Sequence, residues 1–177
     1  MGHIVLERLN RHDLPAVQAL LEACHEQFAL GRRASPTAAV SLHQRLPHGV
    51  SPADRHLLGI TDPATRELLG LIDAVAHYPD AGTLTVGLFL VSPLYAEGAA
   101  AQEAQGLLEA WAAARGMLRA RIEVSADSWT ALHFWQAAGF VAEAEPVRTG
   151  RKLVVVFEKW LTDGPELDRG SSAWWMI

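Results

Sequence analysis

The sequence predicts an α/β protein built around a central mixed β-sheet. Strand-like and helix-like segments follow one another in mixed order along the chain, a pattern typical of a sheet covered by helices. The two longest predicted strands, residues 68–77 and 83–91, are apolar on both faces, so both sides of the sheet should be covered. The length of 177 residues suits one domain with one core. We expect residues 1–162 to form this domain and residues 163–177 to form a C-terminal tail.

The composition excludes several classes of protein. A formal net charge of −5 argues against a nucleic-acid partner, because a phosphate-binding surface needs a basic excess. Cys24 is the only cysteine, so no internal disulfide can form, and no Cys/His cluster predicts a metal site. The chain begins without the regions of a secretory signal, and it has no apolar run of the ~20 residues that span a bilayer. We therefore expect a soluble, cytoplasmic protein with no membrane partner.

The first third of the chain should form a strand and two helices. Residues 4–9 are predicted as the strand. Asp13 is placed to cap the first helix, Pro15 suits its first turn, and Gly31 ends it. A second, short helix is expected within residues 35–49. The apolar positions of the first helix recur at helical spacing and are Leu14, Val17, Leu20, Leu21, Cys24 and Phe28.

The middle of the chain should form an antiparallel hairpin beside a further strand. Residues 55–60 are predicted as a short strand, followed by a turn at Asp62–Pro63. Residues 68–77 and 83–91 then form two long strands, reversed by a loop at 78–82.

The second half should continue with helices and strands in turn. A long amphipathic helix ends at Gly116, a strand covers 121–124, and another helix starts at Asp127–Ser128. Residues 140–145 and 152–160 are expected to pair as a closing hairpin.

The stretch from Val86 to Phe140 carries the main functional signal. An apolar strand ends in a turn at Pro93, and a loop of small residues at 97–101 precedes the long helix. Small residues let the backbone approach a phosphate group, and the free N–H groups of a helix N-terminus bind anions. Phe134–Trp135 and Gly139–Phe140 follow after the next strand. The order is strand, phosphate-type loop, helix, strand and helix.

With these residues the chain resembles the GNAT superfamily of acetyl-CoA-dependent N-acetyltransferases. The resemblance is closest over residues 69–140 and looser over 4–161. It rests on the ordered features Leu69-Gly70-Leu71-Ile72, Tyr78-Pro79-Asp80, Gly87-Leu88-Phe89-Leu90-Val91, Pro93, Ala112 to Gly116, Ile122-Glu123-Val124, Phe134-Trp135 and Gly139-Phe140. It implies a GNAT-type central mixed, mostly antiparallel sheet flanked by helices on both faces. It also implies an acyltransferase that moves an acetyl group from the cosubstrate acetyl-CoA to a primary amine of a small molecule, peptide or protein by direct attack.

The resemblance also implies where acetyl-CoA would bind. The strand at 83–91 would splay from its neighbour and open a slot for the pantetheine arm, with which its backbone would pair. The following loop and helix N-terminus would bind the pyrophosphate, and Ser128 and Trp135 would flank the thioester. The implied cofactor-binding residues are Phe89, Leu90, Val91, Ala96, Glu97, Gly98, Ala99, Ala100, Ala101, Gln102, Ser128 and Trp135.

The phosphate-binding loop departs from the family pattern. The family usually has Arg or Gln at the position of Ala96 and Gly at that of Ala99. Glu97 would disfavour a nearby pyrophosphate, an effect of about 0.3–1 kcal/mol at an exposed helix N-terminus. The family's frequent tyrosine, which protonates the departing thiolate, falls at Trp135, whose indole N–H has no usable acidity. Ser128, where the family often has Asn, can still cap its helix and reach a ligand.

Three residues are candidates for proton transfer, and each has an alternative interpretation. Asp73 interrupts an apolar strand and would line the substrate end of the slot, but the favoured alternative is a hydrogen-bonded strand carboxylate at a sheet edge. Glu123 could act as a base, or it could pair with Arg119 or Arg121. Ser128, or water, would supply the proton that the missing tyrosine does not.

A second class of function stays open. The degenerate loop and Trp135 are also consistent with a non-catalytic GNAT-fold module that binds another ligand or a partner protein. The apolar residues Trp174 to Ile177 are expected to pack on the body of the protein or across a homodimer interface.

Overall fold

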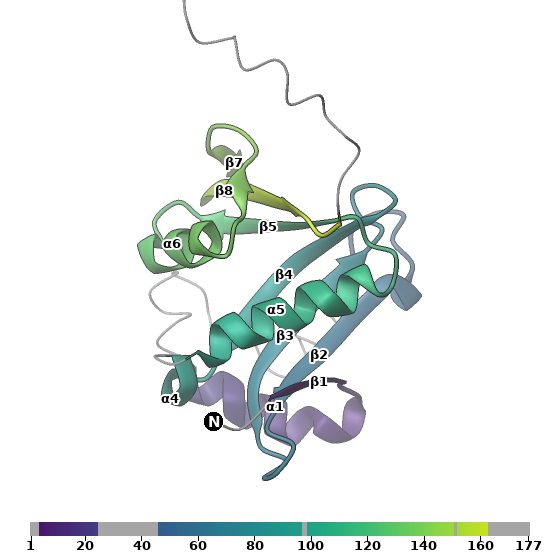
Figure 1. Ribbon diagram of the computed structural model, residues 1–177, viewed down its shortest axis with the longest axis vertical. Coiled ribbons are helices and arrows are strands. Elements are labelled where there is room, and N and C mark those ends of the chain that lie inside the picture. The colour runs from purple at the N-terminus through teal and green to yellow at the C-terminus, as the bar shows by residue number, and fades with distance from the viewer. Residues whose placement is uncertain (1–3, 25–45, 97–98, 151, 163–177) are drawn as a thin grey trace, which may run out of the picture.

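The described residues of the protein form one eight-stranded sheet in the order β1-β2-β3-β4-β5-β8-β6, with β7 also paired to β8 (Figure 1). The computed structural model describes residues 4–24, 46–96, 99–150 and 152–162. Of the strand pairs in these residues, β4 and β5 are parallel and the others antiparallel, so the predicted mixed, mostly antiparallel sheet is confirmed. The strands are β1 Val5–Arg8, β2 Arg55–Thr61, β3 Leu68–Ala76, β4 Thr83–Val91, β5 Arg119–Ser125, β6 Val141–Ala142, β7 Val147–Thr149 and β8 Lys152–Trp160.

Helices cover both faces of the sheet, as the apolar strands predict. They are α1 Leu14–Ala23, α4 Pro93–Ala96, α5 Ala100–Ala113 and α6 Trp129–Ala137, with short 3-10 turns at Arg11–Asp13 and Pro52–Asp54. On one face α1 packs its buried residues against Leu57, Leu71 and Leu90. On the other face α5 and α6 cover a larger core that includes Ile72 and Phe157 (Figure 1). The two layers together bury most of β3 and β4, although Gly87 of β4 stays exposed.

Several predicted boundaries need correction. Pro93 starts the short helix α4 instead of a turn. The predicted hairpin partner of β8, residues 140–145, is shortened to β6, and the separate strand β7 pairs with β8 after Pro146, which has no N–H to donate to a ladder. Asp13 occupies the N-cap position of α1 without a side-chain cap bond, and its carboxylate accepts from the backbone N–H of Asn10 instead. The predicted helix end at Gly31 and the predicted helix within 35–49 lie wholly or mainly outside the described residues.

A β-bulge in β4 changes which side chains face each layer. Asp73 of β3 pairs with Leu88, and the next residue, Ala74, pairs with Val86, so Gly87 is an extra residue in β4. Beyond the bulge, Leu88 and Leu90 pack on the α1 side, while Phe89 and Val91 pack on the α5 side. A glycine within a strand is a known signal of such a bulge.

His56 lies at the edge of the larger core, near the C-terminal end of α5. Its ring contacts Trp111 edge-on at a centroid distance of 4.9 Å, and the guanidinium of Arg115 lies over the same indole at 4.2 Å. Burial lowers the pKa of His56 below its ordinary value of 6.5, and the charges of Arg8, Arg115 and His77 lower it further. Asp54 acts in the opposite direction. The folded protein therefore favours the neutral ring.

We expect Gly70→Ala to destabilise the fold and Gly106→Ala to stabilise it. A Cβ at Gly70 would lie 2.5 Å from the carbonyl oxygen of Leu90, so the backbone of β3 or β4 must shift. The expected loss is about 1–3 kcal/mol of unfolding free energy, as for other overpacked cores. A Cβ at Gly106, inside α5, meets nothing within 4 Å, and the gain in helix propensity is about 0.5–1 kcal/mol. Urea denaturation of both variants measures the two changes, and equal signs would contradict this account.

We expect His56 to make stability depend on pH. Because its folded-state pKa is lowered, the unfolded state binds more protons at mildly acidic pH. The contribution of neutral His56 to the free energy of unfolding is complete above pH 6.5. It is lost as the pH falls below that value towards the folded-state pKa of His56. When the pH is lowered from about 8 to about 5, the free energy of unfolding should therefore fall less for His56→Phe than for the unaltered protein. His12→Phe, at an exposed position outside this cluster, should keep the original dependence. Identical slopes for both variants would refute the assignment.

Candidate functional site

The central feature of the candidate site is a gap between the two parallel strands. The register of β4 and β5 begins at Thr83 and Arg119 and ends at Val86 and Ile122. Beyond this point β4 continues along β3 to Val91, and β5 continues along β8 to Ser125. Figure 1 shows β5 turning away from β4. From Gly87 to Leu90, no strand of the described chain pairs with the side of β4 that faces away from β3. Peptide groups on this side are free to pair with an extended ligand.

Two residues occupy the point where the strands separate. Gly87 follows Val86 in β4 and forms the bulge, while Glu123 follows Ile122 in β5. Ile122 is buried in the α5 and α6 core, so by strand alternation Glu123 faces the opposite side of the sheet. Its side chain is 42% exposed and lies 3.2 Å from Nη1 of Arg121. The predicted pairing of Glu123 with Arg121 is thus present, and much of the carboxylate is accessible to water.

One side of the gap is covered by aromatic rings. Phe89 of β4 lies 5.3 Å from Trp135 and 5.7 Å from Phe134, both on α6. Trp135 also meets Phe140 at 4.9 Å and is 4% exposed. The Phe89–Trp135 and Trp135–Phe140 pairs are edge-to-face, and such pairs are worth about 0.5–1.5 kcal/mol each beyond the area they bury. The structure therefore places the two predicted residues Phe89 and Trp135 in contact, and their cluster holds α6 against β4.

The N-terminus of α5 follows the end of β4. Ala99 is its N-cap, with φ −67° and ψ −7°, and the methyl group of Ala99 cannot make a cap bond. The first-turn N–H groups, at Ala100 to Gln102, therefore receive no cap from the N-cap side chain. Ala99 has right-handed backbone, so this position has no steric need for glycine. Ala96 ends α4, and Glu97 and Gly98 lie outside the described residues.

Ser128 lies at the N-terminus of α6, three residues after β5 ends. It occupies the N-cap position with φ −94° and ψ 78°, but its hydroxyl makes no cap bond. The expectation that Ser128 caps the helix is therefore wrong. Its backbone N–H donates to the carbonyl of Ser125 at 3.0 Å, which tightens the turn out of β5. Ser128 and Trp135 thus come from the same helix, at the end of the sheet where the gap opens.

Asp73 is bound on both of its oxygens. Nε of Arg55 donates to Oδ1 at 2.9 Å, and Nη2 donates to Oδ2 at 2.6 Å. Both side chains are largely buried, at 12% and 13% exposed. Asp73 pairs with Leu88 next to the bulge, so this ion pair supports the site from β2 and β3. The interpretation of Asp73 as a hydrogen-bonded strand carboxylate agrees with this geometry, but its expected place at a sheet edge is wrong, because β3 lies between β2 and β4.

Sequence reasoning missed Arg55 and the bulge. Arg55 starts β2 and reaches Asp73 diagonally across the ladder, a contact that depends on the register of two strands far apart in sequence. Gly87 offered a signal, since glycine within an apolar strand often marks a bulge. No hydrogen bond joins Asp73, Glu123 and Ser128 to one another within the described part of the chain.

Metal and membrane features can be assessed for the same residues. Residues 4–24, 46–96, 99–150 and 152–162 contain no group of three His, Cys, Asp or Glu side chains placed to hold a metal ion. In these ranges no helix has the length and apolar character needed to cross a membrane.

Comparison with known proteins defines the fold. No family model and no curated protein matches the chain. An acetyltransferase from Thermus thermophilus matches with a TM-score of 0.72 and 23% identity, over 90% of this chain and 99% of that one. A spermidine N-acetyltransferase from Vibrio cholerae, in complex with CoA and spermine, matches with a TM-score of 0.70 and 14% identity, over 90% of this chain and 96% of that one. The ribosomal-protein-S18-alanine N-acetyltransferase of Escherichia coli matches with a TM-score of 0.68 and 14% identity, over 93% of this chain and 97% of that one. The chain has the fold of the GNAT superfamily.

Proposed function

We propose that the protein is an N-acetyltransferase that moves an acetyl group from acetyl-CoA to a primary amine by direct attack. The observation that carries the proposal is the gap between β4 and β5, which opens at the end of β4 that leads through α4 to the N-terminus of α5. A free strand edge suits the amide groups of a pantetheine arm, and a helix N-terminus suits a pyrophosphate. Both features lie on the chain in the order that one extended CoA molecule requires. The match to a structure in complex with CoA supports the same ligand.

The residues that would hold acetyl-CoA divide into three groups. The backbone of Phe89 and Leu90 would pair with the pantetheine arm, and Val91, the last residue of β4, would lie at the end of this contact. Positions 96–102 would surround the pyrophosphate, with N–H groups from the first turn of α5. Ser128 and Trp135 would lie beside the thioester, which supplies the activated acetyl group when bound. Trp135 is held in the aromatic cluster, so its part is to shape this side of the gap.

Glu123 is the stronger candidate for the base. An ammonium acceptor must lose a proton before it can attack, and a carboxylate acting through water can take it. Asp73 has both oxygens bound by Arg55, which favours a supporting role. Glu123 is half-exposed at the point where β4 and β5 separate, on the face opposite α5. An acceptor would therefore approach from that face, and Ser128 would be the nearest hydroxyl on α6 able to return a proton to the thiolate.

The acceptor is proposed only as a class. Matching structures are named as N-acetyltransferases for spermidine and for an alanine of ribosomal protein S18, so the fold serves both small and large amines. We therefore propose a small-molecule, peptide or protein amine. Spermine and a peptide with an N-terminal alanine are the first acceptors to assay.

A non-catalytic binding role is the second candidate. The buried indole of Trp135 stands where the family's tyrosine would donate a proton, and an indole N–H cannot do so. A protein that binds CoA but transfers no acetyl group to any amine would fit this candidate and contradict the first.

We expect Ala96→Arg to raise CoA affinity by about 2- to 5-fold, because a cation near the pyrophosphate contributes about 0.3–1 kcal/mol. Ala99→Gly should not raise it, since Ala99 already has the right-handed backbone that the helix start requires. Isothermal titration with CoA measures both changes. Ala114→Arg adds the same charge at the C-terminal end of α5 and is the matched control. No heat with CoA at high concentration of the unaltered protein would refute the proposal.

We expect Glu123→Gln to lower kcat for amine acetylation by roughly 10²–10⁴-fold, as for loss of a general base. Affinity for CoA should stay within about 2-fold, because Glu123 lies on the other face from α5. The loss should shrink at high pH, where the acceptor amine is already neutral. Glu143→Gln, at an exposed position after β6, serves as the control. An unchanged kcat would remove Glu123 from the mechanism and leave the CoA site untouched.

A further inference from the structure

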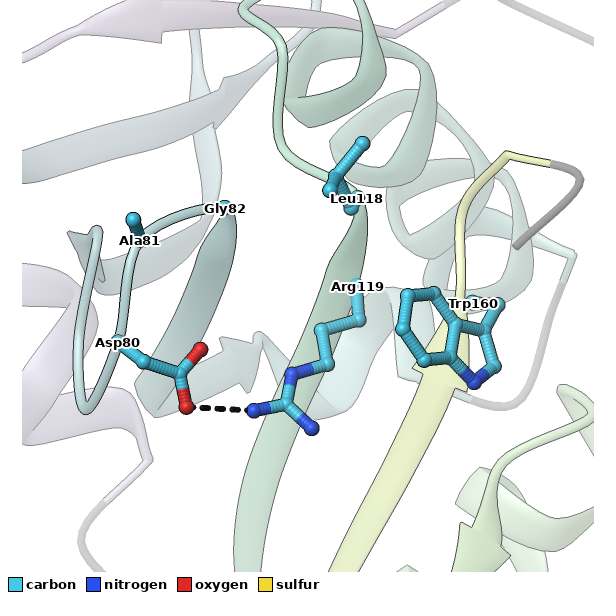
Figure 2. Close-up of a pocket in the computed structure, with 6 residues that line it drawn as sticks. All are labelled: Asp80, Ala81, Gly82, Leu118, Arg119 and Trp160. Carbon is cyan, nitrogen blue, oxygen red and sulfur yellow. Dashed lines mark hydrogen bonds and ion pairs between the residues drawn. The ribbon is translucent and has the colours of Figure 1, made fainter. Parts of the chain in front are cut away.

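A cavity lies at the end of the parallel strand pair that is opposite to the gap. Its volume is about 260 Å³, and it is lined by Asp80, Ala81, Gly82, Leu118, Arg119 and Trp160 (Figure 2). Residues 80–82 precede β4, residues 118 and 119 lead into β5, and Trp160 ends β8. The gap opens only beyond Val86 and Ile122, so the cavity is separate from the proposed CoA site.

The polar groups of this cavity are already paired within the protein. Nη2 of Arg119 lies 2.6 Å from Oδ2 of Asp80, as Figure 2 shows, and Nη1 lies 3.0 Å from Glu158. Nε of Arg119 donates to the hydroxyl of Thr83 at 2.8 Å, and that hydroxyl donates to the other oxygen of Asp80 at 2.6 Å. A charged ligand would have to compete with these bonds. The cavity therefore favours an occupant that needs few polar partners.

The remaining walls are apolar and incompletely buried. Leu118 is 47% exposed and Trp160 is 44% exposed, and they stand on either side of Arg119 (Figure 2). Water against these two side chains is unfavourable, so an apolar group that covered both would be held there. The volume is below the ~300–1,000 Å³ of typical small-molecule pockets, and it suits a single large side chain better than a cofactor.

We propose that this cavity is the docking site for the apolar residues of the same chain's tail, with an indole of Trp174 or Trp175 as the inserted group. The tail is tethered at the cavity itself, because Trp160 is one of its walls and the described chain continues to Thr162. The residues that follow, 163–177, include Trp174, Trp175, Met176 and Ile177. An extended chain from Thr162 to Trp174 spans at most about 40 Å, at ~3.3–3.6 Å per residue, which is ample to return to the cavity.

Tethering also favours this occupant over a free ligand. A segment joined to its site by a short linker has an effective concentration in the millimolar range. Between Thr162 and Trp174 the sequence has no aromatic residue, so the first large ring that can reach the cavity is that of Trp174. The docked tail would join the end of β8 to the loop before β4, and it would leave the gap between β4 and β5 open to a ligand.

The test uses the full chain labelled with 5-fluorotryptophan, and ¹⁹F NMR resonances assigned from single Trp→Phe variants. In the unaltered protein the resonances of Trp174 or Trp175 should show the small solvent-isotope shift of a buried indole. Leu118→Asp places a carboxylate in the cavity wall and should move that resonance to the position of an exposed indole. Leu94→Asp, at a position 84% exposed on α4, is the matched control and should not move it.

Several outcomes would overturn the proposal. Both indoles could give the full solvent-isotope shift in the unaltered chain, a result that does not depend on any variant folding. The protected resonance could be insensitive to Leu118→Asp. Protection could also appear only at high protein concentration together with a doubled mass in sedimentation, which would make a second copy the occupant. Protection that is independent of concentration in a monomer, and lost with Leu118→Asp, supports the proposal.

Discussion

The early end of pairing between β4 and β5 is the constraint on which the rest of the site depends. β5 is committed to β8 along its whole length, from Arg119 to Ser125, and β4 is committed to β3. Each strand follows its own antiparallel partner, so the two can remain paired only over four residues, Thr83 to Val86 in β4. The aromatic cluster of Phe89, Phe134, Trp135 and Phe140 then fills one side of the opening and holds α6 there. The gap is thus bordered by side chains that pack within the protein.

The other elements of the site follow from this separation. Each strand of the parallel pair leads into a helix at the same end of the sheet: β4 into α4 and α5, and β5 into α6. The N-terminus of α5 and Ser128 of α6 are therefore brought to the open end, and Glu123 lies where the opening starts. The Gly87 bulge turns Leu88 and Leu90 towards α1 and Phe89 towards α6. Side chains of β4 therefore pack against both helical layers in the segment where β5 no longer pairs with it. The free edge of β4, the N-terminus of α5 and the carboxylate of Glu123 thus all lie at the end of the sheet where β4 and β5 separate, with Glu123 on the face opposite α5.

The sequence predicted the fold better than the site. Strand and helix periods placed β3, β4 and α5 within a few residues, since these elements are long and their apolar patterns are strong. The pairing of Glu123 with Arg119 or Arg121 was also predicted, and Arg121, on the same face of β5, is the partner. The Arg55 contact to Asp73 and the pairing of both β6 and β7 with β8 depend on strand register, which propensity does not fix. The missing cap at Ser128 depends on how the turn after β5 closes, which residue preference alone does not decide.

The central claim is that the free side of β4 receives the pantetheine arm. Amide hydrogen exchange with and without saturating CoA tests it directly, because a ligand that pairs with this side must protect its N–H groups. The account predicts slower exchange in peptides that cover Gly87 to Leu90 and the first turn of α5, with no change in β1. CoA binding that leaves exchange in β4 unaltered would contradict it and place the ligand elsewhere.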